Sequence, residues 1–172
     1  MAKEEYKNRK YTVLSYNSEW EKQFEIEAEH LRQIFSDKAI LIEHIGSTSV
    51  PGLAGKPTID ILVIVERIET ADELSGKIEH IGYKCLGDYI NKGSRLFVKE
   101  EGGVRLLNLH IFPADNPHAR DMIHVRNYFR SHPEAIAEYS NLKFDLARKY
   151  PNDYGLYRTH KDEWMENLKR SI

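Results

Sequence analysis

The sequence IEHIGSTSVPGLAGKPTIDILVIV, residues 42–65, sets the architecture of the chain. Both of its ends are rich in β-branched and apolar residues, and the second end is nearly continuous in apolar character, which is typical of a strand covered on both faces. A turn rich in glycine and proline separates them. We therefore expect two central strands, over residues 39–45 and 58–65, joined by a loop.

Periodic patterns continue on either side of this segment. A strand-like stretch, residues 11–16, leads to Ser18, where S-E-W-E has the form of a capping box and apolar residues then follow at helical spacing. Thr70 is suited to begin a helix that runs to about Ile81. Three further strands are expected near residues 83–86, 94–100 and 104–112, with a Glu-Glu-Gly-Gly turn between the last two.

The pattern changes after Pro113, because no β-branched run follows it. Helical spacing appears instead over residues 116–130, 134–149 and 153–169. No linker composition separates the two parts. The sequence thus predicts an α/β (α+β) fold in one domain, residues 1–172, with a mixed β-sheet and flanking helices over about 11–113 and a helical part over about 114–172.

Composition narrows the function classes. The chain has 172 residues, of which 41% are hydrophobic and 30% charged, and its formal net charge of -2 offers no general attraction to nucleic acids or anionic membranes. Its one cysteine, Cys85, cannot form an intramolecular disulfide. The N-terminal residues are charged, and no apolar run is long enough to span a bilayer. We expect a cytoplasmic protein without a nucleic-acid or membrane partner; the sequence does not indicate its oligomeric state.

The loop between the two strands has the chemistry of a phosphate site. Gly46 and Ser47 form a turn that would expose backbone N–H groups, and Thr48 and Lys56 add a hydroxyl and a cation. The Walker A spacing is absent, so this is no P-loop. The alternative is a plain tight connection between strands.

Asp60 is the second signal, since a carboxylate within an apolar strand is costly to bury unless it is paired or bound to a metal. An ion pair with Lys56, Arg95 or Arg105 would satisfy it structurally. Residue alternation also places Asn108, His110 and Phe112 on one face of their strand. If the two strands are neighbours, Asp60 and His110 can meet.

Several motifs together resemble the GrpB family. They are H-I-G-S-T-S-V-P-G-L-A-G-K-P-T-I-D-I-L-V, LNLHIF at residues 107–112, RNYFRSHPEAIAEYSNLK at 126–143, and Tyr157 with Lys161. The resemblance covers about residues 11–165 and implies a nucleotidyltransferase-like fold. In that fold Gly46 and Ser47 match the Gly-Ser turn and Asp60 the first carboxylate, whereas Leu62 replaces the second and His110 the third.

These departures change the metal chemistry that the resemblance implies. One carboxylate and an imidazole supply too few oxygen ligands to hold two Mg²⁺ ions. His44, Asp60 and His110 would instead make a single site that by ligand type suits Mn²⁺, Fe²⁺ or Zn²⁺ better than Mg²⁺. In the competing interpretation His110 only donates a hydrogen bond to Asp60, and no metal binds.

Basic residues elsewhere would hold the remaining phosphates of a ligand. The candidates are Lys143, Lys161, Arg126 and Arg95, each of which has an ordinary surface charge as its alternative. We arrive at two hypotheses. The first is a nucleotidyltransferase-like, metal-dependent enzyme acting on a nucleotide or phosphorylated small molecule, with Asp60 and His110 catalytic. The second is a non-catalytic module that binds a phosphorylated metabolite, and a role near coenzyme A metabolism follows from the resemblance.

Overall fold

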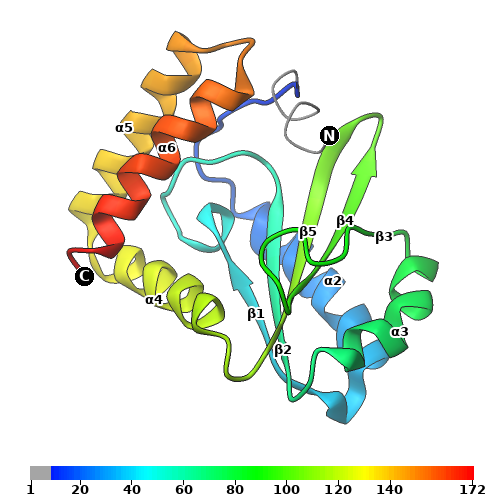
Figure 1. The fold of residues 1–172 in the computed structure, drawn as a ribbon. Helices are drawn as coiled ribbons and strands as arrows, with labels where there is room; N and C mark the ends of the chain where they lie inside the picture. Colours follow the sequence, from blue (N-terminus) through cyan, green and yellow to red (C-terminus); the bar gives the residue numbers. More distant parts are fainter. Residues whose placement is uncertain (1–8) are drawn as a thin grey trace.

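The computed structural model describes residues 9–172, so the charged segment 1–8 lies outside the described residues. Five strands form a single mixed sheet: β1 (Ala39–Ile45), β2 (Ile59–Val65), β3 (Lys84–Cys85), β4 (Arg95–Glu101) and β5 (Val104–Pro113). Their order is β1-β2-β5-β4-β3, and only β2 and β5 run parallel. The predicted α/β class with a mixed sheet is confirmed (Figure 1).

One expectation about the sheet was wrong. β1 is an edge strand, whereas β2 is central, between β1 and β5. Both strands are apolar in sequence because both are covered by helices, and an apolar pattern reports how the faces of a strand are covered rather than how many strands it pairs with. The stretch 11–16, predicted to be strand-like, forms only an isolated bridge between Leu14 and Gly55.

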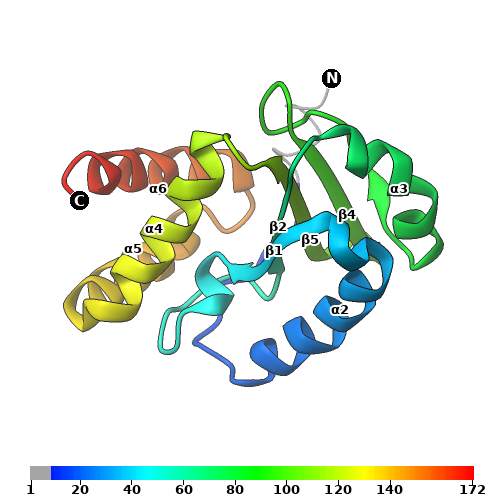
Figure 2. The same ribbon diagram turned by 90° about the horizontal axis from the view of Figure 1, so that it is seen from below.

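Helices α2 (Glu19–Phe35) and α3 (Glu69–His80) cover one face of the sheet (Figure 2). The apolar stripe predicted for α2 is buried against the sheet, and the shared core includes Phe24, Leu31, Phe35, Ile61, Val63, Leu109 and Ile111. The predicted capping box is wrong, since Ser18 makes no side-chain cap and Asn17 Oδ1 instead accepts the N–H of Glu19.

The opposite face belongs to the helical part: α4 (Pro117–Ser131), α5 (Pro133–Lys149) and α6 (Tyr154–Lys169). α4 packs on the sheet through Ala119 and Met122, which contact the cluster around Leu62 and Phe112. α5 and α6 pack beside the loop after β1, which buries Val50. Within residues 9–172 no helix is both long and apolar enough to cross a membrane. The loop after β1 and the carboxylate of Asp60 on β2 lie on the side of the sheet where α4, α5 and α6 pack.

Candidate functional site

The turn after β1 requires a glycine. Gly46 has a φ of 73°, and a Cβ built on it would lie 2.5 Å from Oδ2 of Asp60. An L side chain would therefore be strained there and would collide with the carboxylate. Ser47 begins the short 3₁₀ helix η2 (Ser47–Ser49), in which the hydroxyl of Ser49 donates to the carbonyl of Gly46 at 2.6 Å. This geometry brings Ser47 to the mouth of the site beside Asp60.

Asp60 is held by the neighbouring strand, as residue alternation predicted. β2 pairs with β5 so that Asp60 lies opposite Asn108. Its Oδ1 accepts a hydrogen bond from Asn108 Nδ2 at 2.8 Å and lies 3.3 Å from His110 Nε2, while Oδ2 has no hydrogen-bond partner among the described residues. Burial would raise the pKa of Asp60, but the hydrogen bonds from His110 and Asn108 and the charge of Lys56 hold it below its ordinary value. Asp60 therefore remains a carboxylate with one oxygen available.

The ion pairs considered for Asp60 do not form. Arg105 pairs with Glu100 at 2.8 Å, and Arg95 pairs with Asp72. The ammonium of Lys56 donates to the hydroxyl of Tyr154. His110 and Asn108 are thus the direct partners of the carboxylate.

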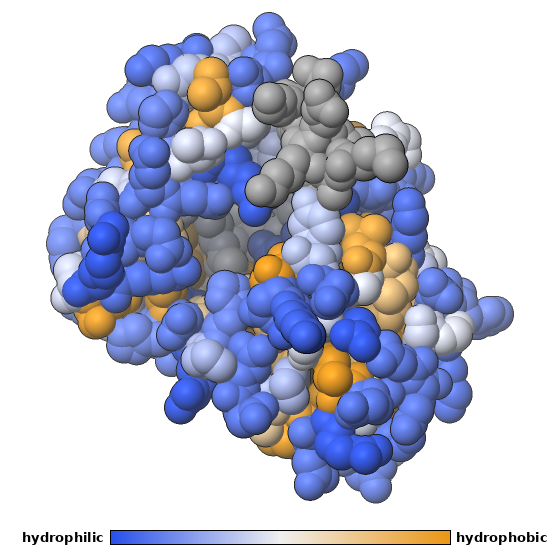
Figure 3. Space-filling model, in the orientation of Figure 1, coloured by the Kyte–Doolittle hydropathy of each residue, from blue (hydrophilic) through white to orange (hydrophobic). Residues whose placement is uncertain are grey.

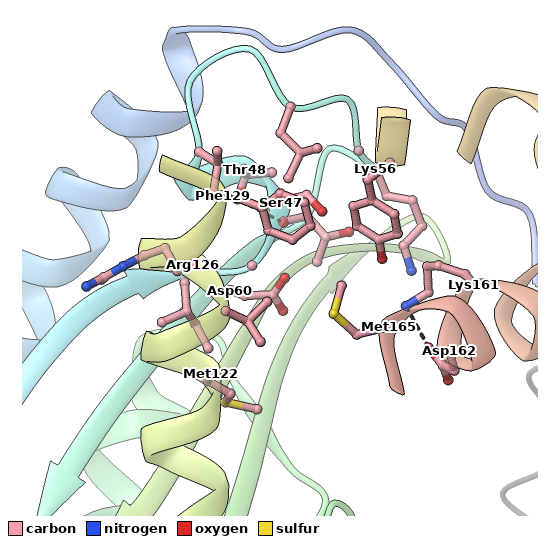
Figure 4. A pocket seen from close by; sticks show the side chains of 18 of the residues that line it. Ser47, Thr48, Lys56, Asp60, Met122, Arg126, Phe129, Lys161, Asp162 and Met165 are labelled. Carbon is pink, nitrogen blue, oxygen red and sulfur yellow. Dashed lines mark hydrogen bonds and ion pairs between the residues drawn. The ribbon is translucent and has the colours of Figure 1, made fainter. Parts of the chain in front are cut away.

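A cleft of about 400 Å³ separates the sheet-bearing part from the helices. Figure 3 shows it as a hollow between the helices at the left and the rest of the molecule. Most of the predicted site residues line it: Gly46, Ser47, Thr48, Lys56, Asp60, His110, Lys143 and Lys161. In Figure 4, Asp60 lies on the floor, with Ser47 above it and Lys56 and Lys161 at one side. The structure therefore brings together groups from β2, β5, the loop, α5 and α6.

Three lysines, Lys56, Lys143 and Lys161, line this cleft. Lys143 is 1% exposed, and its Nζ donates to Ser47 Oγ at 2.8 Å and to the carbonyl of Ala54. Lys161 pairs with Asp162 at 2.8 Å. Burial would lower the pKa of Lys161, but Tyr139 and the carboxylate of Asp162 raise it, so this side chain stays charged.

Lys56 and Lys143 differ from Lys161, because neither has a carboxylate partner among the described residues. Burial lowers the pKa of Lys56. Burial likewise lowers the pKa of Lys143, well below its ordinary value, and the nearby charges of Lys161 and Lys56 add to this effect. An anion that enters the cleft would supply the missing counter-charge.

Two predicted site residues lie elsewhere. Arg95 makes a two-pronged pair with Asp72 of α3, at 2.6 and 2.7 Å, and does not line the cleft. His44 is on the α2 face of β1, where its ring stacks on Phe24 with centroids 4.7 Å apart and its Nε2 lies 2.9 Å from the hydroxyl of Thr48. Alternation along β1 turns His44 away from Asp60, so the predicted set of His44, Asp60 and His110 does not assemble.

Two of the lining polar groups are engaged in structural contacts. Arg126 lines the cleft, but its guanidinium donates to the carboxylate of Glu43 and, at 2.9 Å, to the carbonyl of His44. Figure 4 shows its side chain directed away from Asp60. The hydroxyl of Thr48 is buried against His44. Arg126 thus holds α4 to β1, and Thr48 holds the loop to β1.

The apolar wall of the cleft was not predicted. It is formed by side chains of α4 and α6, namely Met122, Val125, Phe129 and Met165. In the sequence these residues show only the helical spacing of a buried face, which does not separate core positions from cleft positions. This wall would contact the less polar part of a ligand.

The donor set suits one cation better than two. In residues 9–172 no group of three or more His, Cys, Asp or Glu side chains is placed to hold a metal ion. Leu62, at the position of a second carboxylate, is fully buried in the core beneath α4. The free Oδ2 of Asp60 can supply a single ligand, and the remaining ligands would have to come from a bound phosphate and water. A two-metal arrangement does not fit these residues.

Comparison with known proteins agrees with this fold and gives the family of the chain. The family model for the GrpB protein matches residues 10–171. The UPF0157 protein YqkA of Bacillus subtilis (strain 168) is 37% identical over 169 residues, covering 96% of this chain and 49% of that protein. A dephospho-CoA kinase of Mycolicibacterium paratuberculosis is 25% identical over 88% of this chain and 43% of its own length. The chain thus spans about half the length of these curated relatives.

Solved structures also match the fold of this chain. The conserved protein GrpB from Enterococcus faecalis superimposes with a TM-score of 0.87 at 38% identity, over 93% of this chain and 96% of that one. A cytoplasmic RNA terminal U-transferase matches 80% of this chain and 41% of its own with a TM-score of 0.54 and 16% identity, which is a likeness of fold alone. The chain belongs to the GrpB family, and its fold is distantly similar to that of nucleotidyltransferases.

Proposed function

We propose that this chain is a nucleotidyltransferase-like protein that binds a nucleotide or another phosphorylated small molecule in the cleft. The observation that carries the proposal is the convergence of the Gly46–Ser47 turn and the side chains of Lys56, Lys143 and Lys161 on one side of the carboxylate of Asp60. Hydroxyl and ammonium donors of this kind recognise phosphate oxygens. The cleft thereby offers an anion site and a carboxylate side by side.

The charges of the cleft indicate where the phosphate would lie. Lys161 already has a carboxylate partner in Asp162, whereas Lys56 and Lys143 have only neutral ones in the described part of the chain. A phosphate beside Ser47 would offset the charge of Lys56 in surroundings of low polarity, where an ion pair is stronger than in water. The less polar part of the ligand would then lie along Phe129 and Met165.

A divalent cation fits between such a phosphate and Asp60. Oδ2 of Asp60 is free of hydrogen bonds, and Mg²⁺ or Mn²⁺ is commonly held by one or two carboxylates together with phosphate oxygens. Such a cation would neutralise charge on the phosphoryl group. His110 and Asn108 would orient Asp60 for this task, so His110 acts here as a positioning residue.

A second function is favoured by Leu62. This residue is completely buried where active nucleotidyltransferases carry a carboxylate, so the cleft has one acidic metal ligand rather than a set. A protein that binds and carries a phosphorylated metabolite needs only the anion site. The similarity to mycobacterial dephospho-CoA kinases makes coenzyme A precursors a natural ligand class to test for this function.

The test is a thermal-shift screen of nucleotides and coenzyme A precursors, each with Mg²⁺, Mn²⁺ or Zn²⁺ and with a chelator. A ligand at 100 times its Kd adds about 2.7 kcal/mol, which for a chain of this size raises Tm by roughly 5–10 °C. A metal-dependent shift followed by turnover supports the transferase, and a shift without metal dependence supports the binding protein. No shift with any phosphorylated compound, in a panel that also includes inorganic pyrophosphate, would contradict the proposal.

A further inference from the structure

Ser47 and Lys143 form a close pair at the edge of the cleft. Nζ of Lys143, on α5, lies 2.8 Å from Oγ of Ser47, although the two residues are 96 positions apart in the chain. Lys143 is 1% exposed, whereas Ser47 is half-buried and lines the cleft. A bound molecule can therefore reach the hydroxyl but not the amine behind it.

The surroundings of Lys143 favour a neutral amine. Its Nζ also contacts the carbonyl of Ala54 and lies 4.2 Å from the centre of the Tyr139 ring. The charged groups that act on it are Lys56 and Lys161, both cations. A buried ammonium without a carboxylate is unstable, and burial lowers the pKa of Lys143 well below its ordinary value.

A neutral lysine has two N–H groups and one lone pair. As an ammonium, Lys143 donates to Ser47 Oγ. Once that proton is lost, one N–H can donate to the carbonyl of Ala54 and the other can face the ring of Tyr139, so the lone pair can accept the hydroxyl proton of Ser47 and the direction of the hydrogen bond reverses. A serine whose hydroxyl donates to a buried base has the arrangement of an activated nucleophile.

The loop holds this pair in place. A Cβ built on Gly55 would lie 2.8 Å from the Cβ of Ser47 and 3.9 Å from Nζ of Lys143, so the backbone at Gly55 is packed against both residues. Ala54, whose carbonyl contacts Lys143, has its own N–H bonded to the hydroxyl of Ser140 on α5 at 3.0 Å. The loop and α5 together fix the distance between Ser47 and Lys143.

We propose that Ser47 is a nucleophile with Lys143 as its general base, and that it accepts a phosphoryl group from an activated phosphate in the cleft. This inference rests on the proposed function in one respect, namely that the cleft binds a phosphorylated ligand. It also gives a use to a site in which Leu62 stands where a second carboxylate would bind metal, because the acceptor oxygen is then the protein's own.

The step balances as follows. The lone pair of Lys143 takes the hydroxyl proton of Ser47, Oγ forms a bond to phosphorus, and the bond from phosphorus to the leaving group breaks. The leaving group departs with that electron pair. Lys56 and Lys161 line the same cleft and would offset the negative charge that develops on the phosphoryl oxygens.

A small dialkyl fluorophosphate tests the pair directly. Ser47 would displace fluoride and gain a dialkylphosphoryl group, detected by intact mass and located by peptide mapping. We expect one adduct per chain, on Ser47, that is absent in Ser47→Ala and forms at least about 100-fold more slowly in Lys143→Met. Ser131→Ala, at an exposed position of α4, and Lys149→Met, exposed on the helix of Lys143, are matched controls that should label like the wild type.

Lys143→Arg places another long basic side chain at this position, but the guanidinium stays protonated and cannot act as a base near neutral pH. It should lose labelling as Lys143→Met does, which separates base catalysis from simple packing and guards against a methionine variant that fails to fold. The wild-type rate should rise with pH and level off well below the ordinary pKa of lysine. No adduct on Ser47, or equal labelling in wild type and Lys143→Arg, would overturn the proposal.

The reagent contains no nucleotide and needs no cation, so its result is independent of the ligand screen. Labelling of Ser47 together with an empty screen would leave the nucleophile standing and reject the nucleotide site. A positive screen without labelling would reject the nucleophile alone. The two proposals can thus fail separately.

Discussion

His110 Nε2 lies 3.3 Å from Oδ1 of Asp60, across two parallel strands whose residues are 50 positions apart in the chain. Asn108 Nδ2 holds the same oxygen at 2.8 Å. Both partners come from alternate positions of β5, so the pleat of the sheet itself orients the carboxylate. As a consequence Oδ2 is turned toward Gly46 and the cleft.

Gly46→Ala should damage both the turn and the site. The new Cβ would lie 2.5 Å from Oδ2 of Asp60 at a φ of 73°, and we expect a loss of about 1–3 kcal/mol in the free energy of unfolding, measured with urea. Gly76→Ala is the matched control, since Gly76 lies within α3 with nothing near its Cβ, and should stabilise by about 0.5–1 kcal/mol. Similar effects of the two substitutions would disprove the crowding at Gly46.

His44 should make stability depend on pH. Burial lowers the pKa of His44 to about 4. Between about pH 6.5 and 4 the imidazole is therefore protonated in the unfolded chain but neutral in the folded chain. Stability is therefore greatest above pH 6.5 and falls as the pH drops to about 4, by at most about 3 kcal/mol from this residue.

The measurement is urea unfolding of the wild type and His44→Gln at pH 7 and pH 4.5. Other groups titrate in both proteins, so the difference between their pH dependences isolates His44. The wild type should lose more stability than the variant between the two pH values. Equal losses would mean that folding does not lower the pKa of His44.

The lysines of the cleft should matter for binding, and Arg95 should not. Lys56→Gln and Lys161→Gln each remove a cation that lines the cleft, and we expect Kd for the nucleotide with the largest thermal shift to rise about 10- to 100-fold. Arg95→Gln removes a pair with Asp72 outside the cleft and should leave Kd unchanged. Titration calorimetry measures all three. A weaker Kd in Arg95→Gln comparable to that of the lysine variants would contradict the location of the site.

Much of this arrangement could be predicted from local patterns. The two strands on either side of the loop, the Gly-Gly turn before β5 and the three C-terminal helices follow from periodicity and turn residues, which act over a few positions. The meeting of Asp60 and His110 followed from alternation, given that their strands are neighbours. The loop also pointed to Ser47, and the resemblance of residues 126–143 to a family motif pointed to Lys143.

The site predictions that were wrong depended on contacts between segments far apart in the sequence. Arg95 and Lys161 are both basic residues in suitable patterns, and only the position of α3 relative to α6 decides that one pairs with Asp72 and the other enters the cleft. His44 shows the same limit, because a histidine suited to a metal is identical in sequence to one that stacks on Phe24. The apolar wall at Met122 and Met165 gives no local signal of its own.

The most direct measurement compares the wild type with Asp60→Asn in the thermal-shift assay, with nucleotide and Mg²⁺ or Mn²⁺, and with a chelator. The amide has the shape of the carboxylate but binds a divalent cation poorly, and Asp145→Asn on the exposed face of α5 is the control. We predict a metal-dependent rise in Tm for the wild type and the control that is lost in Asp60→Asn, with the fold retained. A full metal-dependent rise in Asp60→Asn would contradict the placement of the cation at Asp60.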